Sequence, residues 1–193
     1  YGAIAAELEE QLPCAPTHVI LQAGVGSFAG ALSSALDEFF PQAAPVFLVT
    51  ETAAAPCLLL SAEAGETRAC TGEIRTIMAG LACGEPCIPG LRSLLGRARF
   101  FTALPDMWAA EAMRALARPL DGDEVVVAGE SGAAGFGLLL ALMRDASLSP
   151  LREAAGLGPD SRVLVFSTET ATDPINYKKI VGNFARQTPS KDV

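Results

Sequence analysis

The segment at residues 21–30, LQAGVGSFAG, joins a glycine-rich loop to the start of a helical pattern. It follows THVI, which has the pattern of a buried strand. Gly24 and Gly26 carry no Cβ, so the backbone N–H groups around them are left uncovered. Exposed amides at the positive end of a helix suit an anion such as phosphate. A plain strand-to-helix turn explains the same residues equally well, so the loop alone does not decide between the two.

This loop matches neither of two common nucleotide-binding patterns. A P-loop needs a Lys-Ser or Lys-Thr pair after the glycines, and none follows here. The dinucleotide pattern G-x-G-x-x-G is missed by one residue, which stands before Gly30.

Two other expected strand ends carry polar groups. AGESGAAG places Glu130 after an apolar run, and FSTETATD places Ser167 and Thr168 after another. In an open α/β sheet, ligands bind beyond the carboxyl ends of the strands. Helix capping and solvation explain each segment separately. A ligand with one phosphate and a nitrogen-containing planar ring would use all three strand ends together.

Alternating strand and helix patterns must position these residues. The strands are continuously apolar, which predicts a three-layer α/β/α fold with a mostly parallel open sheet. Residues 52–66 favour a short helix after Pro56, and residues 72–87 give a mixed pattern. The expected strands cover residues 17–24, 45–51, 99–104, 123–131 and 161–170, and the expected helices cover residues 4–12, 26–40, 90–98, 107–117 and 132–145, with one helical turn from Pro174.

Composition excludes several classes of function. The 193 residues carry a net charge of −8 and 6% aromatic residues, so we expect neither nucleic acid nor membrane as a partner. Five cysteines without scaffold spacing suit a reducing cytoplasm. Cys83 and Cys87 would need further ligands to hold zinc, so no metal site is expected, and His18 is interpreted as structural.

Several motifs together resemble the diaminopropionate ammonia-lyases. These are pyridoxal-phosphate (PLP) enzymes of the tryptophan-synthase-β fold, also called fold type II. The matching segments are PTHVILQAGVGSFAGAL, TIMAGLACGEP, GESGA and STE-x-x-TDP-x-x-Y, in the family's order and over nearly the whole chain. Thr170 and Ala171 stand where the family has a Gly-Asp pair. The resemblance implies the large domain of that fold over residues 1–181, truncated at its N-terminal side, and a polar tail over residues 182–193.

The resemblance also implies a reaction, the α,β-elimination of 2,3-diaminopropionate to pyruvate and ammonia, and roles for individual residues. The amides of Gly24, Val25, Gly26 and Ser27 would hold the PLP phosphate. Ser167 or Thr168 would face the pyridine nitrogen, and the neutral hydroxyl would favour elimination over transamination. Ala79, Gly80 and Glu130 would lie near the ring, with Glu85 at the mouth of the site.

The lysine that binds PLP in this family has no counterpart here. The only lysines are Lys178, Lys179 and Lys191, and none has the family's lysine context. The sequence begins at Tyr1 inside a helical pattern, so we expect a part of a longer protein that has no catalytic residue of its own and is inactive alone. The full enzyme would be a cytoplasmic homodimer acting on a small amino acid. Two alternatives stay open: a related enzyme for another β-substituted amino acid, and a non-catalytic domain that binds a phosphate ligand or a partner chain.

Overall fold

The structure is a computed structural model that describes residues 1–182. The tail expected over residues 182–193 therefore lies outside the described residues, apart from Gly182. Within the described part, no helix combines the length and the apolar character needed to cross a membrane. In chain order the elements are α1 (Gly2–Gln11), β1 (His18–Gln22), α2 (Ser27–Phe39), β2 (Val46–Thr52), α3 (Cys57–Ala64), the 3₁₀ turn η1 (Ala79–Leu81), α4 (Ile88–Leu95), β3 (Ala98–Leu104), α5 (Asp106–Ala117), α6 (Ala134–Arg144), η2 (Ala146–Leu148), α7 (Ser149–Ala155), β4 (Val163–Val165) and α8 (Pro174–Val181).

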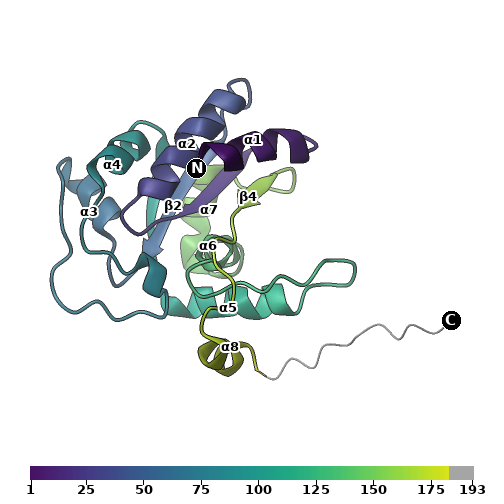
Figure 1. Cartoon of the computed structure of the whole chain (residues 1–193). Coiled ribbons are helices and arrows are strands. Elements are labelled where there is room, and N and C mark those ends of the chain that lie inside the picture. The colour runs from purple at the N-terminus through teal and green to yellow at the C-terminus, as the bar shows by residue number, and fades with distance from the viewer. Residues whose placement is uncertain (183–193) are drawn as a thin grey trace.

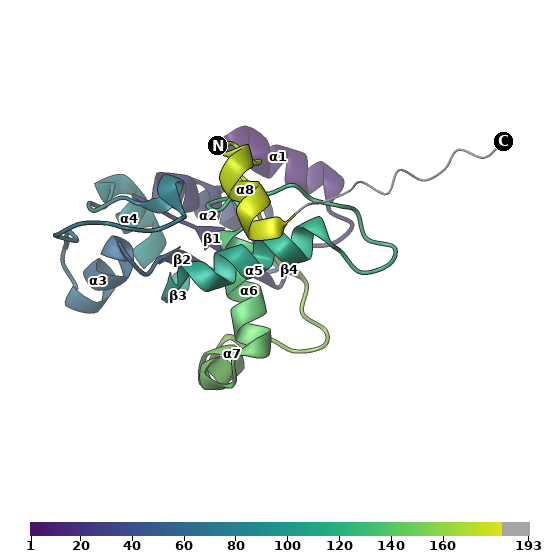
Figure 2. The same ribbon diagram turned by 90° about the horizontal axis from the view of Figure 1, so that it is seen from below.

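The four strands form one parallel sheet in the order β3-β2-β1-β4, with helices on both faces (Figures 1 and 2). Alternate residues of β1 point to opposite layers, as strand geometry requires. Val19 and Leu21 pack in a core with α2 and α4, whereas Ile20 packs in a second core with α6 and α7. The predicted α/β fold with a parallel sheet covered on both faces is confirmed.

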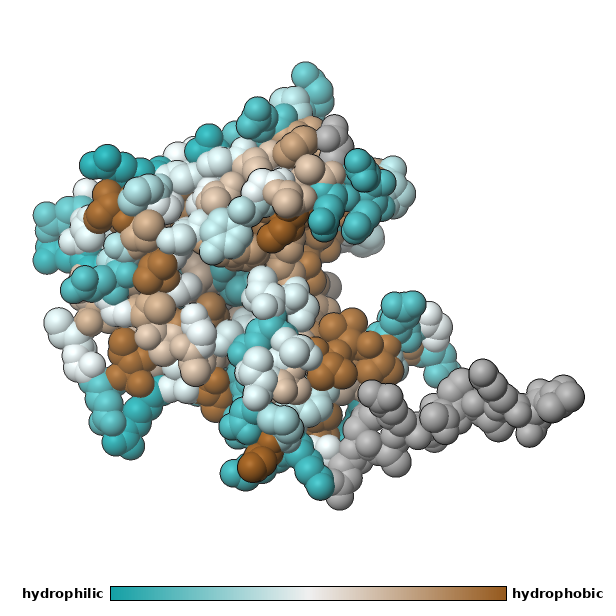
Figure 3. Space-filling model, in the orientation of Figure 1, coloured by the Kyte–Doolittle hydropathy of each residue, from teal (hydrophilic) through white to brown (hydrophobic). Residues whose placement is uncertain are grey.

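The prediction of a strand over residues 123–131 is wrong. Residues 124–129 join no ladder of the sheet, whose two edge strands are β3 and β4. The segment instead returns along the preceding helix, where Val126 N–H donates to the Leu116 carbonyl at 3.0 Å. Val125–Val127 remain 37–52% exposed. Figure 3 shows that apolar side chains reach the surface at several places on this face of the molecule.

Other element boundaries differ in smaller ways. The strand expected at residues 161–170 is shorter, since only Val163–Val165 pair with β1. The mixed segment at residues 72–87 contains only the turn η1 (Ala79–Leu81). The helical turn expected from Pro174 extends to Val181, and Asp173 caps it by accepting the N–H groups of Ile175 and Asn176, both at 3.0 Å.

His18 has the structural role expected of it. The side chain is buried, and its Nε2 donates to the Ala155 carbonyl at 2.8 Å. Its Nδ1 lies 2.8 Å from Thr17 Oγ1. Both ring nitrogens thus have a partner, and the bond from Nε2 joins the start of β1 to the end of α7.

Candidate functional site

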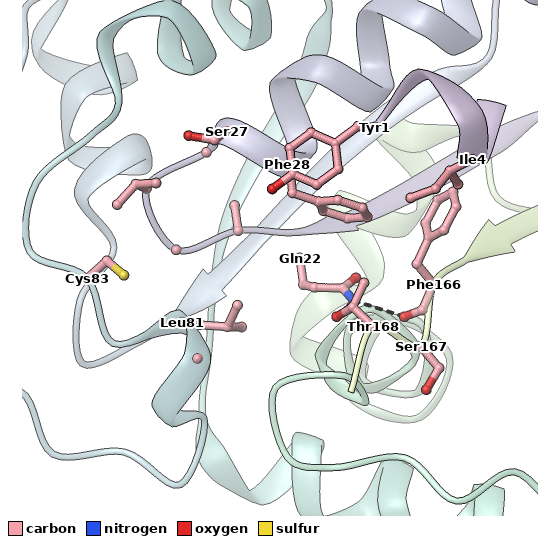
Figure 4. Close-up of a pocket in the computed structure, with 15 residues that line it drawn as sticks. Tyr1, Ile4, Gln22, Ser27, Phe28, Leu81, Cys83, Phe166, Ser167 and Thr168 are labelled. Atoms are coloured by element: carbon pink, nitrogen blue, oxygen red, sulfur yellow. Dashed lines mark hydrogen bonds between the residues drawn. The ribbon is translucent and has the colours of Figure 1, made fainter. Parts of the chain in front are cut away.

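A cavity of about 590 Å³ opens beyond the carboxyl ends of β1 and β4 (Figure 4). Its size is in the range of small-molecule and cofactor sites. Three separate stretches of chain form most of its wall, and the first turn of α1 adds to it. The lining residues are Tyr1, Ile4, Gln22, Ala23, Gly24, Val25, Gly26, Ser27, Phe28, Gly80, Leu81, Cys83, Phe166, Ser167 and Thr168.

The glycine loop offers the cavity a set of free amides. Within the described residues, the N–H groups of residues 24–27 donate to no other protein group. Gly26 precedes α2 with φ at +89°, a conformation that side chains other than glycine rarely adopt, and no side chain caps the helix. Buried or enclosed amides of this kind need an acceptor. A phosphate supplies several acceptor oxygens and a charge that suits the positive end of α2.

The turn at residues 79–83 packs directly against this loop. A Cβ on Gly24 would lie 3.0 Å from Cys83 Sγ and 3.3 Å from the Gly80 carbonyl oxygen. Gly80 lines the cavity, whereas Ala79 does not. The Gly80 N–H donates to Ser131 Oγ at 2.9 Å, which ties this turn to the start of α6.

The exit of β4 faces the loop from the other side. Both Ser167 and Thr168 line the cavity, but they lie differently in it. Gln22 Nε2 donates to Thr168 Oγ1 at 3.0 Å, and in Figure 4 the Ser167 side chain points away from Gln22. The turn after them closes with a 2.8 Å bond from Thr172 N–H to the Thr170 carbonyl. It does so without positive φ at Thr170 or Ala171.

The structure does not bring Glu130 to the cavity wall. Glu130 is only 6% exposed, and its Oε1 accepts a hydrogen bond from Asn176 Nδ2 on α8. It lies one residue from Ser131, whose hydroxyl holds Gly80. Glu85 is exposed and does not line the cavity. Of the residues expected at the site, the four loop residues, Gly80 and the two hydroxyls thus meet at one cavity, and Ala79 and Glu130 lie behind it.

The sequence analysis missed two groups of lining residues. Tyr1, Phe28 and Phe166 form a row of edge-to-face rings, with centroids 5.5 Å and 5.8 Å apart. Only their proximity in space reveals this row, because the sequence separates them widely. Gln22 had a visible signal, since it is a polar residue that ends an otherwise apolar strand.

A buried carboxylate supports the loop from behind. Glu51 on β2 is fully buried, and it accepts the N–H groups of Leu58 and Leu59 at 2.8 Å each, which fixes the start of α3. Burial raises the pKa of Glu51 from 4.5 to about 7, while the two amides oppose the rise. Burial and the neighbouring Glu51 also raise the pKa of Cys57 to about 12, so this thiol stays protonated.

Glu51 makes stability depend on pH. Its folded pKa, about 7, exceeds the ordinary 4.5, so its favourable contribution is greatest below pH 4.5 and is lost as pH rises through 7. Relative to Glu51→Gln, we expect the parent protein to lose roughly 2–3 kcal/mol of unfolding free energy between pH 5 and pH 8. Urea denaturation at both pH values measures this. Glu63→Gln, an exposed position on α3, is the control and should track the parent. A pH-independent difference between Glu51→Gln and the parent would contradict the raised pKa.

The comparison with protein families gives the decisive match. Residues 1–169 match the family described as pyridoxal-phosphate dependent enzyme. The chain belongs to this family. The expected cofactor is therefore confirmed as pyridoxal phosphate.

Relatives of this pyridoxal-phosphate dependent enzyme include two named diaminopropionate ammonia-lyase. The one from Salmonella typhimurium is 41% identical over 190 residues, which cover 95% of this chain and 47% of the relative. The one from Escherichia coli is 40% identical over 185 residues, which cover 94% of this chain and 46% of the relative. The chain thus spans just under half the length of these relatives.

Solved structures agree with the sequence matches. Escherichia coli diaminopropionate ammonia lyase, in complex with an aminoacrylate-PLP azomethine reaction intermediate, superposes with a TM-score of 0.82 and 38% identity. The match covers 92% of this chain and 45% of that one. Maize serine racemase has the same fold, with a TM-score of 0.74 at 19% identity over 92% of this chain and 51% of that one.

Proposed function

We propose that this chain forms the cofactor-phosphate-binding part of an ammonia-lyase that converts 2,3-diaminopropionate into pyruvate and ammonia by α,β-elimination. One observation carries the proposal above the others. The free amides of residues 24–27 and the Thr168 hydroxyl line the same cavity, in a chain 41% identical to a diaminopropionate ammonia-lyase. Pyridoxal phosphate has a phosphate group that the amides can bind and a ring nitrogen that the hydroxyl can bind.

In this proposal each group binds one part of the cofactor. The amides of residues 24–27 and the positive end of α2 hold the phosphate. Between the two hydroxyls, Thr168 is the better partner for the pyridine nitrogen, because Gln22 fixes it in the cavity. Gly80 borders the ring and is held by the Ser131 hydroxyl, and Ala79 and Glu130 are the chain neighbours of these two residues. When bound, pyridoxal phosphate supplies the electron sink for negative charge at the substrate Cα.

In this proposal, the lysine that binds the cofactor aldehyde lies outside these 193 residues. Lys178 and Lys179 lie exposed on α8, and neither lines the cavity. The relatives are about twice as long as this chain, which leaves room for a part that carries the lysine and the acid-base groups. We therefore expect the 193 residues to bind the phosphate end of the cofactor and to be inactive without that part.

Setting and assembly are further parts of the proposal. Free cysteines, with Cys57 buried in the core, suit a reducing cytoplasm. The net charge of −8 disfavours nucleic acid and anionic membranes as partners. We propose a homodimer that takes a small amino acid, as the resemblance implies.

Pyruvate formation tests the proposal. The full protein, which joins these residues to the part that carries the lysine, is loaded with pyridoxal phosphate and incubated with 2,3-diaminopropionate, and pyruvate is measured through NADH consumption by lactate dehydrogenase. Serine and threonine serve as competing substrates, because Thr170 and Ala171 depart from the family's Gly-Asp pair. We expect 2,3-diaminopropionate to react fastest. A preference for serine or threonine would establish the alternative enzyme, and retention of cofactor without any turnover would establish a binding domain.

A further inference from the structure

Gln22 stands out as a polar side chain in a buried place. It ends β1, is 2% exposed and lines the cavity. Its Nε2 donates two hydrogen bonds, to the Phe166 carbonyl at 2.9 Å and to Thr168 Oγ1 at 3.0 Å. A carbonyl oxygen can only accept, so the bond to Phe166 fixes which end of the amide faces β4. Thr168 Oγ1 must then accept a hydrogen bond from Gln22.

The other end of the amide gains nothing for stability. Gln22 Oε1 is buried and has no hydrogen-bond partner within the described residues. A Cβ on Gly135 would lie 3.0 Å from this oxygen, so the start of α6 leaves room for it. A buried carbonyl without a partner destabilises the fold. An apolar side chain of similar length would avoid that cost, so this oxygen does not explain why a glutamine stands here.

The contact with Thr168 does explain it. A hydroxyl group has one proton to donate and two sites that accept. Because Gln22 occupies one accepting site of Oγ1, the Thr168 proton turns away from Gln22. Donation into Oγ1 also makes the hydroxyl a better donor, since linked hydrogen bonds polarise one another. Ser167 points away from Gln22 (Figure 4), so the structure singles out Thr168.

We propose that Gln22 is a positioning residue that holds the Thr168 hydroxyl as a hydrogen-bond donor to the unprotonated pyridine nitrogen of the cofactor. This inference rests on the proposed function, which places that nitrogen beside Thr168. A ring nitrogen whose lone pair accepts a hydrogen bond from the Thr168 hydroxyl binds a proton from water less readily. Gln22 thereby sets how strongly the ring withdraws electrons, although it need not touch the ring itself.

The ring nitrogen can be observed directly in the loaded protein. Pyridoxal phosphate labelled with ¹⁵N in the ring gives a chemical shift that reports its protonation across a pH series. In Gln22→Met, which keeps the length but cannot donate, the Thr168 hydroxyl is free to rotate and accept. We expect the ring nitrogen to bind protons about tenfold more tightly than in the parent, a rise of about one pKa unit. Cofactor retention on dialysis should stay within about tenfold, because the phosphate amides are untouched.

Three further variants separate this role from a merely structural one. Thr168→Val should shift the ring titration as well, and adding Gln22→Met to it should produce no further change. Ser167→Ala is the matched control and should titrate like the parent. Thr168 is at an exposed strand exit, so its variant tests the proposal even if Gln22→Met does not fold.

Different results would overturn the role of Gln22 and the proposed function. An unchanged ring titration in Thr168→Val or in a folded Gln22→Met overturns the role of Gln22. So does an effect of Gln22→Met that persists undiminished in the Thr168→Val background. If the parent protein does not retain pyridoxal phosphate at all, the proposed function itself fails.

Discussion

Replacing Gly26 by aspartate is expected to lower the affinity for pyridoxal phosphate by at least ~100-fold, or about 2.7 kcal/mol. The carboxylate would enter the group of free amides at residues 24–27 and repel the phosphate that they bind. Hydrogen bonds to a charged group contribute about 1.5–3 kcal/mol each, so losing one or two gives an effect of this size. Equilibrium dialysis, read by cofactor absorbance, measures the change.

Gly26→Asn separates charge from backbone strain. Asparagine has nearly the shape of aspartate and accepts the left-handed conformation that φ of +89° demands. Its Cβ would meet Leu58 at 3.0 Å, as the aspartate would, and both contacts involve the movable end of a side chain. We expect Asn to reduce affinity several-fold less than Asp. Equal losses in the two variants would show that strain, and not charge, governs the loop.

Gly90→Ala is expected to destabilise the fold by roughly 3 kcal/mol and to weaken cofactor binding as well. Gly90 lies in α4 where that helix touches the loop and α2 backbone to backbone. A Cβ there would stand 2.6 Å from the Gly26 carbonyl oxygen, and one on Gly30 would stand 2.7 Å from the Gly90 carbonyl oxygen. Backbone atoms cannot rotate away, so α4 must shift or the cofactor loop must deform.

The helix propensity of alanine would raise the stability of the variant, whereas the close contact would lower it, so the sign of the change distinguishes the two effects. Alanine is a better helix former than glycine by about 1 kcal/mol, so an uncrowded position would gain stability. Gly96→Ala, at the end of the same helix, is the matched control, because its nearest neighbour is 3.7 Å away. Thermal unfolding of both variants should show a large loss for Gly90→Ala and little change for Gly96→Ala. Similar unfolding temperatures for the two would contradict the close contact.

The α/β layers of this fold could be predicted from the sequence, because burial of the strands determines which residue types they contain. Strands covered on both faces must be apolar throughout, and β1, β2 and β3 are close to their predicted ranges. The same rule gave a wrong strand prediction at Val125–Val127. This apolar run pairs with no strand and stays partly exposed. An apolar run indicates contact with other apolar groups, but it does not say whether a sheet or a helix supplies them.

The candidate site was predictable where a short segment contains its own chemistry. Gly26 adopts a positive φ and Gly24 leaves room for the turn at residues 79–83, and the structure places both glycines at the cavity as expected. The choice between Ser167 and Thr168 was not predictable, because it depends on Gln22, 146 residues away from Thr168. The position of Glu130 likewise depends on Asn176 on α8. Contacts between distant segments determine the orientation of Thr168 and the position of Glu130. The spacing of residues along the chain does not predict these contacts.

That separation of 146 residues between Gln22 and Thr168 also constrains how the protein is synthesised. β1 lies inside the sheet, yet its partner β4 and the Thr168 wall of the cavity come near the end of this sequence. At about 5–20 residues per second, a ribosome needs roughly 7–30 seconds between the two. During that interval the side of β1 that later pairs with β4 is open to other strands or to chaperones. The cavity therefore cannot recruit its cofactor to assist early folding, because both of its walls exist together only once translation of this region is nearly finished.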